Sequence, residues 1–420
     1  MVSASVVAQD VERARRTIDT LGHPQMHGRG YVQAGDRRAA DYLAGRMAEA
    51  GVAAAGTEGY LQPFPMPIHT FPGALSLQID SEELRPGLDY LVHPAANAGE
   101  GQGRLLCFDP RDPAQRAALM KADVSRRAVA YDPDALDPDD DADRAVLRHL
   151  VKARALIHLV DQLTHGLSTV PYLPPTFVVK RAAFDSTARR VGWEVEALTY
   201  EDYPSQNVLG LLPGRTQPDS LVVITAHYDH LGRMGRDTYF PGANDNASGV
   251  SMLLELAHHY AALAHRPDYS LLFILFGGEE AGLIGSRYYV EHPTVPLERI
   301  RFLVNLDLLG TGDDGIMAVN ATEFPGAYAL LDSLNRAGGY LPKVARRGPA
   351  ANSDHYFFYR RGVPSFFLYT LGGIAAYHDV LDQPNTLPLT RYEEVFQLLT
   401  DFIGAVQHDP ADVPAVLSEE

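Results

Sequence analysis

Acidic and histidine side chains stand at the ends of several apolar runs in this sequence. These residues are His227 and Asp229 after the run at 221–225, Glu279 and Glu280 after 271–276, and Asp307 after 302–306. Short apolar runs that alternate with helical stretches are typical of a largely parallel sheet covered by helices on both faces. Ligands of such α/β sheets bind at the carboxyl ends of the strands. The sequence therefore predicts that three distant segments bring metal-binding side chains to one sheet edge.

Two further candidate ligands lie outside these strand ends. Asp245 stands just before a predicted helix, where free N–H groups and the helix dipole favour a carboxylate. His378 follows the last apolar run, at 365–369. Imidazole and carboxylate groups suit Zn²⁺, although Co²⁺ or Mn²⁺ can occupy similar sites.

The number of candidates indicates how many ions to expect. His227, Asp245, Glu280, Asp307 and His378 are too many ligands for one catalytic zinc. They fit two ions that share one bridging carboxylate, at the spacing of roughly 3.5–4 Å found in two-metal hydrolases. An adjacent carboxylate that binds no ion is then free to take a proton from the attacking water.

The composition limits the class of protein. The 420 residues carry a net charge of −17, which argues against a nucleic-acid partner. Cys107 is the only cysteine, so a disulfide within the chain and a cysteine-rich metal site are excluded. No apolar stretch is long enough to span a membrane. The amino terminus lacks the apolar core of a signal peptide, which leaves a cytoplasmic protein or an exported one whose signal has been removed.

Changes in sequence pattern divide the chain into four parts. Residues 1–72 open with two helical patterns and end in a proline-rich extended segment. Residues 73–205 contain short strand candidates separated by polar loops, which predicts an inserted, smaller, β-rich α/β subdomain. Residues 206–410 carry the regular α/β pattern and the candidate site, and residues 411–420 form a tail.

The motifs that contain these residues resemble those of family M28 metallopeptidases, which are aminopeptidase-like enzymes with co-catalytic zinc ions. The matching segments are HGRG at 27–30, AHYDH at 226–230, GANDNASG at 242–249, GGEEAGLIGS at 277–286, NLDLLG at 305–310, SDH at 353–355 and YHDVLD at 377–382. The resemblance implies the fold of the zinc aminopeptidases, and the insertion is similar to a protease-associated domain. It also implies that peptides are the substrates.

The resemblance assigns a role to each candidate. His227 and Asp307 would bind one zinc ion, Glu280 and His378 the other, and Asp245 would bridge the two. Glu279 would be the general base. Asp229 is expected to accept the ring N–H of His227, and Tyr377 to donate a hydrogen bond to the oxyanion.

Three classes of function remain open at this stage. Hydrolysis of amino-terminal residues is the favoured activity, with a dipeptidase or a carboxypeptidase as variants. A glutaminyl cyclase-like aminoacyltransferase shares the fold and a segment similar to RRGVP at 360–364, but GEEAGLIGSR at 278–287 runs on without the longer stretch of those enzymes. A binding module that has lost its metals is disfavoured, because all five ligands and the base are present.

Overall fold

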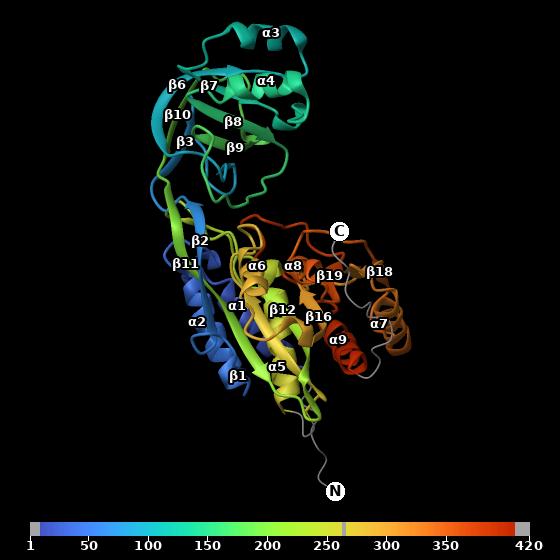
Figure 1. Cartoon of the computed structure of the whole chain (residues 1–420). Coiled ribbons are helices and arrows are strands. Elements are labelled where there is room, and N and C mark those ends of the chain that lie inside the picture. The colour runs from blue at the N-terminus through green and yellow to red at the C-terminus, as the bar shows by residue number, and fades with distance from the viewer. Residues whose placement is uncertain (1–8, 263–265, 408–420) are drawn as a thin grey trace.

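The computed structural model describes residues 9–262 and 266–407, which form two large β-sheets and a two-stranded sheet of β13 (Arg233–Met234) and β14 (Thr238–Tyr239). Each large sheet belongs to one of two units, which Figure 1 shows stacked one above the other. Two long paired strands connect the units: β2 (Leu61–Thr70) and β11 (Leu198–Leu212). The larger unit contains both the first and the last described residues, Gln9 and Gln407.

The larger sheet has nine strands among the described residues. Its order is β1 (Ala53–Ala54), β11, β15 (Tyr269–Phe276), β12 (Gln217–His227), β16 (Ile300–Leu306), β19 (Ser365–Leu371), β17 (Gly315–Val319) and β18 (Val344–Arg346), with β2 paired to β11. The four central strands β15, β12, β16 and β19 are parallel, whereas β11 and β17 flank them in antiparallel orientation. The predicted mixed, largely parallel sheet is therefore confirmed.

Side chains of the central strands alternate between two hydrophobic cores. In β12, Val222 and Ile224 enter one core, whereas Leu221 and Val223 enter the other. This two-residue period follows from strand geometry and shows that both faces are covered. The helices of this unit are α1 (Val11–Leu21), α2 (Gly35–Glu49), α5 (Gly249–Ala262), α7 (Pro325–Gly338) and α9 (Tyr392–Val406) at the first core, and α6 (Ile284–Glu291) and α8 (His355–Arg360) at the second.

The smaller unit is the insertion. Its sheet has the order β4 (Glu82–Glu83), β3 (Leu75–Ile79), β10 (Arg190–Val195), β6 (Gly99–Cys107), β7 (Arg127–Tyr131), β8 (Ala155–Val160), β9 (Thr176–Lys180) and β5 (Tyr90–Val92), with helices α3 (Pro113–Lys121) and α4 (Asp141–Leu150). β10 is the last strand of this sheet along the chain, and it ends at Val195. The chain then enters β11, which belongs to the large sheet. Residues 198–205, predicted as part of the insertion, thus belong to the connecting strand. The predicted tail at 411–420 lies outside the described residues.

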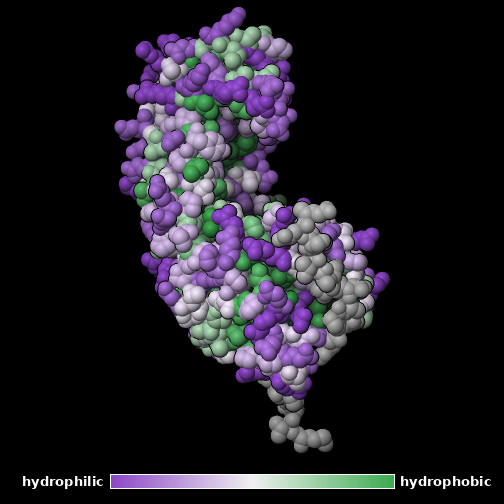
Figure 2. Space-filling model, viewed as in Figure 1, coloured by the Kyte–Doolittle hydropathy of each residue, from purple (hydrophilic) through white to green (hydrophobic). Residues whose placement is uncertain are grey.

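The surface is mainly hydrophilic on the face seen in Figure 2, with a notch between the two units. None of the helices within residues 9–262 and 266–407 is long and apolar enough to cross a membrane.

Candidate metal centre

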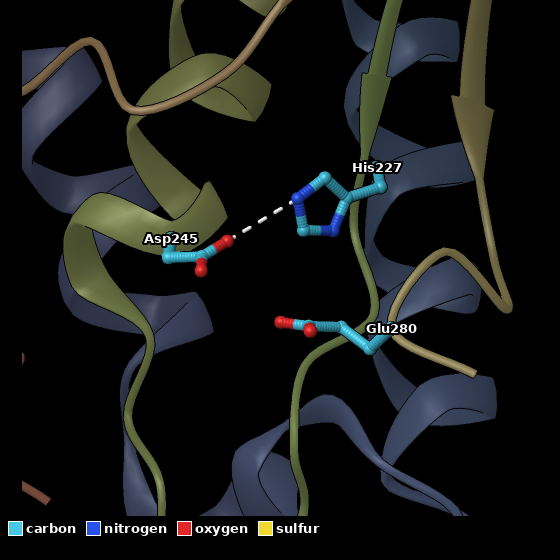
Figure 3. A group of neighbouring side chains, drawn as sticks. All are labelled: His227, Asp245 and Glu280. Atoms are coloured by element: carbon cyan, nitrogen blue, oxygen red, sulfur yellow. Dashed lines mark ion pairs between the residues drawn. The ribbon is translucent and has the colours of Figure 1, made fainter. Parts of the chain in front are cut away.

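The parallel strands bring the predicted ligands together at their carboxyl ends. His227 is the last residue of β12, Asp307 follows β16 directly, and Glu279 and Glu280 follow β15. Asp245 lies in the turn Ala243–Ser248 that precedes α5, where the Asp245–Asn246 peptide bond is cis. Figure 3 shows His227, Asp245 and Glu280 pointing toward one another. Ligand atoms of these three residues lie within 4.8 Å of one another, and so do those of His227, Glu279 and Asp307.

Asp245 lies between two histidines and directs one oxygen to each. Its Oδ1 is 3.2 Å from Nε2 of His227, and its Oδ2 is 3.0 Å from Nε2 of His378. On the first side, Oδ2 of Asp307 is 3.4 Å from the same His227 nitrogen. On the second side, Oε2 of Glu280 is 3.2 Å from the same His378 nitrogen. Each side of Asp245 therefore offers one imidazole nitrogen, one oxygen of Asp245 itself and one carboxylate of a second acidic residue.

The chemistry of these residues fits divalent cations such as zinc. The donors are all imidazole nitrogens or carboxylate oxygens, and Oδ1 of Asp307 is buried without a hydrogen-bond partner among the described residues. Burial raises the pKa of Glu280 to about 7, and the nearby Asp245 carboxylate contributes to the shift. Burial likewise raises the pKa of Asp307. Buried carboxylates at this separation repel one another, and cations between them would relieve both the repulsion and the loss of hydration.

Asp229 supports the site in a way that differs from the prediction. Its main-chain oxygen, not its carboxylate, accepts from Nδ1 of His227 at 3.1 Å, while the carboxylate Oδ1 is 3.8 Å away. The carboxylate instead accepts from the Tyr31 hydroxyl at 2.8 Å and from the backbone N–H groups of Glu279 and Glu280 at 3.2 and 3.3 Å. Asp229 thus fixes both the His227 ring and the turn that carries the two glutamates.

Two residues near the ligands had no predicted role, although both lie in the matching motifs. The Asp382 carboxylate accepts from the backbone N–H groups of Asn244 and Asp245, at 2.9 to 3.0 Å, and thereby fixes the turn that contains Asp245. Nδ1 of the buried His230 lies 2.6 Å from Oε1 of Glu280. The motifs AHYDH and YHDVLD contain these two residues, but spacing alone does not indicate where each side chain points.

The HGRG segment acts through Arg29, whose side chain is fully buried. The guanidinium donates five hydrogen bonds to main-chain oxygens, those of Leu21, Tyr228, Pro241, Gly242 and Asp245. Gly28 has a φ of 62°, and a Cβ there would lie 2.3 Å from the oxygen of Gly232. Glycine at this position therefore allows the segment to approach the loop after β12 closely. Arg29 ties the amino-terminal segment to the loop after His227 and to the turn that contains Asp245.

Replacement of Arg29 by lysine should destabilise the protein. Lysine has three donors on one nitrogen, so some of the five buried carbonyl groups would lose their partner. We expect the free energy of unfolding, measured by urea denaturation, to fall by about 2–4 kcal/mol. The control is Arg37→Lys, because Arg37 forms an exposed ion pair with Asp41 and its replacement should change stability by less than about 0.5 kcal/mol. Equal stability of the two variants would contradict this role.

A cavity of about 370 Å³ opens onto the ligands. Glu279 and Tyr377 line it together with the apolar side chains of Leu283, Leu308 and Phe367. Burial raises the pKa of Glu279 well above its ordinary value. The Tyr377 ring stacks on His378 with 4.0 Å between centroids, and its hydroxyl has no hydrogen-bond partner in the described part of the chain. A carboxyl group and a hydroxyl group therefore face the same cavity as the candidate ligands.

Comparison with known proteins shows which family has a sequence similar to that of this site. The sequence model of peptidase family M28 matches residues 207–403, the segment that holds all five candidate ligands, Glu279 and Tyr377. Residues 207–403 therefore belong to peptidase family M28. Among relatives, aminopeptidase YwaD of Bacillus subtilis is 27% identical over 281 residues, a match that covers 66% of this chain and 57% of YwaD.

Other similar proteins show how much of the chain the similarity covers. The structure of the zinc aminopeptidase BSAP from Bacillus subtilis has a TM-score of 0.70 at 19% identity, covering 94% of this chain and 95% of that one. The similarity therefore extends over both units of the fold. Human transferrin receptor protein 2 is 36% identical over 234 residues, covering 51% of this chain and 28% of the receptor. Because a receptor is similar in sequence to this chain, sequence similarity alone does not define an activity, and the side chains of the site have to support one.

Proposed function

We propose that this M28 protein is an aminopeptidase that uses two zinc ions. The observation that carries the proposal is the position of Asp245, whose two oxygens face His227 and His378 from opposite directions. His227 and Asp307 would hold one ion, His378 and Glu280 the other, and Asp245 would bridge them. The zinc aminopeptidase BSAP, which has the same fold, is consistent with zinc as the metal.

The cavity residues support hydrolysis. Zinc bound here would polarise the scissile carbonyl and lower the pKa of the attacking water. A carboxylate oxygen of Glu279 lies within 4.8 Å of the ligand atoms of His227 and Asp307, so it is close enough to take the proton of a water on that side. The same group then returns the proton to the leaving amine. The Tyr377 hydroxyl is available to donate to the oxyanion that forms on the carbonyl oxygen.

The charge of the site favours a peptide with a free amino terminus. Four acidic side chains line the cavity: Asp245, Glu279, Glu280 and Asp307. A protonated α-amino group is attracted to such a surface, whereas an acetylated one has no charge to contribute. The apolar side chains of Leu283, Leu308 and Phe367 provide contact area for the side chain of the first residue.

A paired substrate series tests the proposal. The protein, loaded with zinc, is assayed on a short peptide and on the same peptide acetylated at its amino terminus, with and without a chelator. We expect release of the amino-terminal residue from the free peptide only, and loss of this activity with the chelator. Cleavage of the acetylated peptide from its carboxyl end would instead indicate a carboxypeptidase. Cyclisation of a glutaminyl peptide without hydrolysis would indicate an aminoacyltransferase.

Replacement of Tyr377 by phenylalanine should lower kcat while zinc binding persists. The variant keeps the ring that stacks on His378 and removes only the hydroxyl. Loss of one oxyanion donor costs about 10²-fold in kcat in other hydrolases. Steady-state kinetics and zinc content provide the measurements, and we expect KM to change little. A kcat equal to that of the unmodified enzyme would exclude Tyr377 as the oxyanion donor.

A further inference from the structure

One segment of the inserted unit contacts the metal centre directly. The backbone N–H of His165 donates to the main-chain oxygen of His378 at 2.8 Å. In return, Nδ1 of His378 lies 3.0 Å from the main-chain oxygen of His165. A carbonyl oxygen only accepts, so Nδ1 must carry the proton and Nε2 is left free for a metal. The two bonds between His165 and His378 therefore fix both the ring orientation and its tautomer.

His378 needs such support more than the other ligands do. Its side chain is 16% exposed, whereas those of His227, Asp245, Glu280 and Asp307 are 2–8% exposed. It lies in a connection without helix or strand after β19, with a φ of 52°. The other four ligands are placed by a strand end or by the turn before α5. The large sheet by itself therefore does little to orient this ring.

The His165 segment is itself held firmly between the two units. Its ring is 5% exposed and stacks on Phe240, with 4.7 Å between centroids and an interplanar angle of 9°. Three residues later, the oxygen of Ser168 accepts from the backbone N–H of His69 in β2 at 2.9 Å. Phe240 also belongs to the hydrophobic core of the insertion, against which Val380, two residues after His378, packs. The insertion and the loop of His378 thus share one packed core.

We propose that the inserted unit completes the metal centre, with His165 as the positioning residue for His378. The inference rests on the two-zinc function proposed above and adds a role for the insertion. The unit that Figure 1 shows above the large sheet would determine how tightly the ion on the His378 side is held. The ion on the His227 side would not depend on it, because Asp229, in the large unit, orients that ring.

Zinc retention in two His165 variants and a control tests the proposal. His165→Pro removes the N–H that donates to His378, and His165→Ala removes the stacking on Phe240. The control is His158→Ala, which removes another buried histidine of the insertion, one that contacts Tyr131 at 2.9 Å. Each full-length protein is loaded with zinc and dialysed against increasing chelator, and zinc per chain is measured by mass spectrometry. Circular dichroism verifies that each variant is folded.

The expected result is selective loss of one ion. Second-layer partners of metal-binding histidines typically contribute 10- to 100-fold in metal affinity. His165→Pro should therefore release one of two zinc ions at 10- to 100-fold lower chelator, His165→Ala should shift in the same direction, and His158→Ala should retain both ions. Retention of both ions by folded His165 variants would overturn this inference alone, as would equal loss in the control. Failure of the unmodified protein to bind two zinc ions would overturn the proposed function as well.

Discussion

Replacement of Glu279 by glutamine is expected to abolish most of the hydrolysis while both zinc ions stay bound. Glutamine keeps the size and polarity of the side chain but cannot accept the proton of the attacking water. General acid–base groups contribute 10²–10⁴-fold, so kcat should fall by about 10³-fold. The measurements are kcat on a free peptide and zinc per chain by mass spectrometry. A variant with unchanged kcat would show that Glu279 is not the base.

The neighbouring residue provides a matched control for this experiment. Glu280→Gln makes the same chemical change one position later, but at a side chain whose Oε2 lies 3.2 Å from Nε2 of His378. This variant should lose activity because it binds one ion weakly, and excess zinc should restore part of the activity. Excess zinc should not restore Glu279→Gln. If both variants respond to zinc in the same way, the distinct roles proposed for the two glutamates would be wrong.

The residues at the carboxyl ends of the parallel strands could be predicted from the sequence, because the pattern of apolar runs determines where each strand ends. Apolar runs define the parallel strands, and the first polar residues after each run must emerge at the same edge. This reasoning places His227, Asp307 and the two glutamates together without knowledge of any contact. The positions of Asp245 and His378 could be predicted only from the motif resemblance. A residue before a helix or in a loop can point away from the sheet edge.

The contacts that orient the ligands could not be read from the sequence. His165 holds His378 through main-chain N–H and C=O groups, which every residue type except proline supplies, so no side-chain pattern marks the position. Asp229 was expected to use its carboxylate, but a two-residue separation also allows the main-chain oxygen to reach the ring. No signal in the sequence marks the start of the connecting strand β11, because it begins at Leu198, soon after β10 ends at Val195.

Removal of the metal should reverse the pH dependence of stability above pH 6.5. Burial alone would lower the pKa of His378, but the carboxylates of Glu280 and Asp245 outweigh this effect and raise it to about 9 in the metal-free protein. The unfolded chain releases this proton near pH 6.5. The folded metal-free protein therefore binds more protons than the unfolded chain between pH 6.5 and 9, and its stability falls as the pH rises through this window. A shift of this size corresponds to roughly 3 kcal/mol.

The zinc-loaded protein should instead become more stable as the pH rises, because zinc binds only the deprotonated His378 ring. At higher pH, protons compete less with zinc for this ring. We expect the difference in Tm between zinc-loaded and chelated protein, measured by calorimetry at pH 6.5, 7.5 and 8.5, to widen at each step. Histidines whose pKa burial lowers, such as His165 and His230, are neutral in the folded protein, and in the unfolded chain they lose nearly all of their protons by about pH 7.5, so they do not oppose the trend above that pH. His378→Gln cannot titrate and should reduce the slope of the metal-free protein, while His227, whose pKa is also raised, keeps part of it. Parallel Tm profiles with and without zinc would show that His378 does not exchange a proton for the metal.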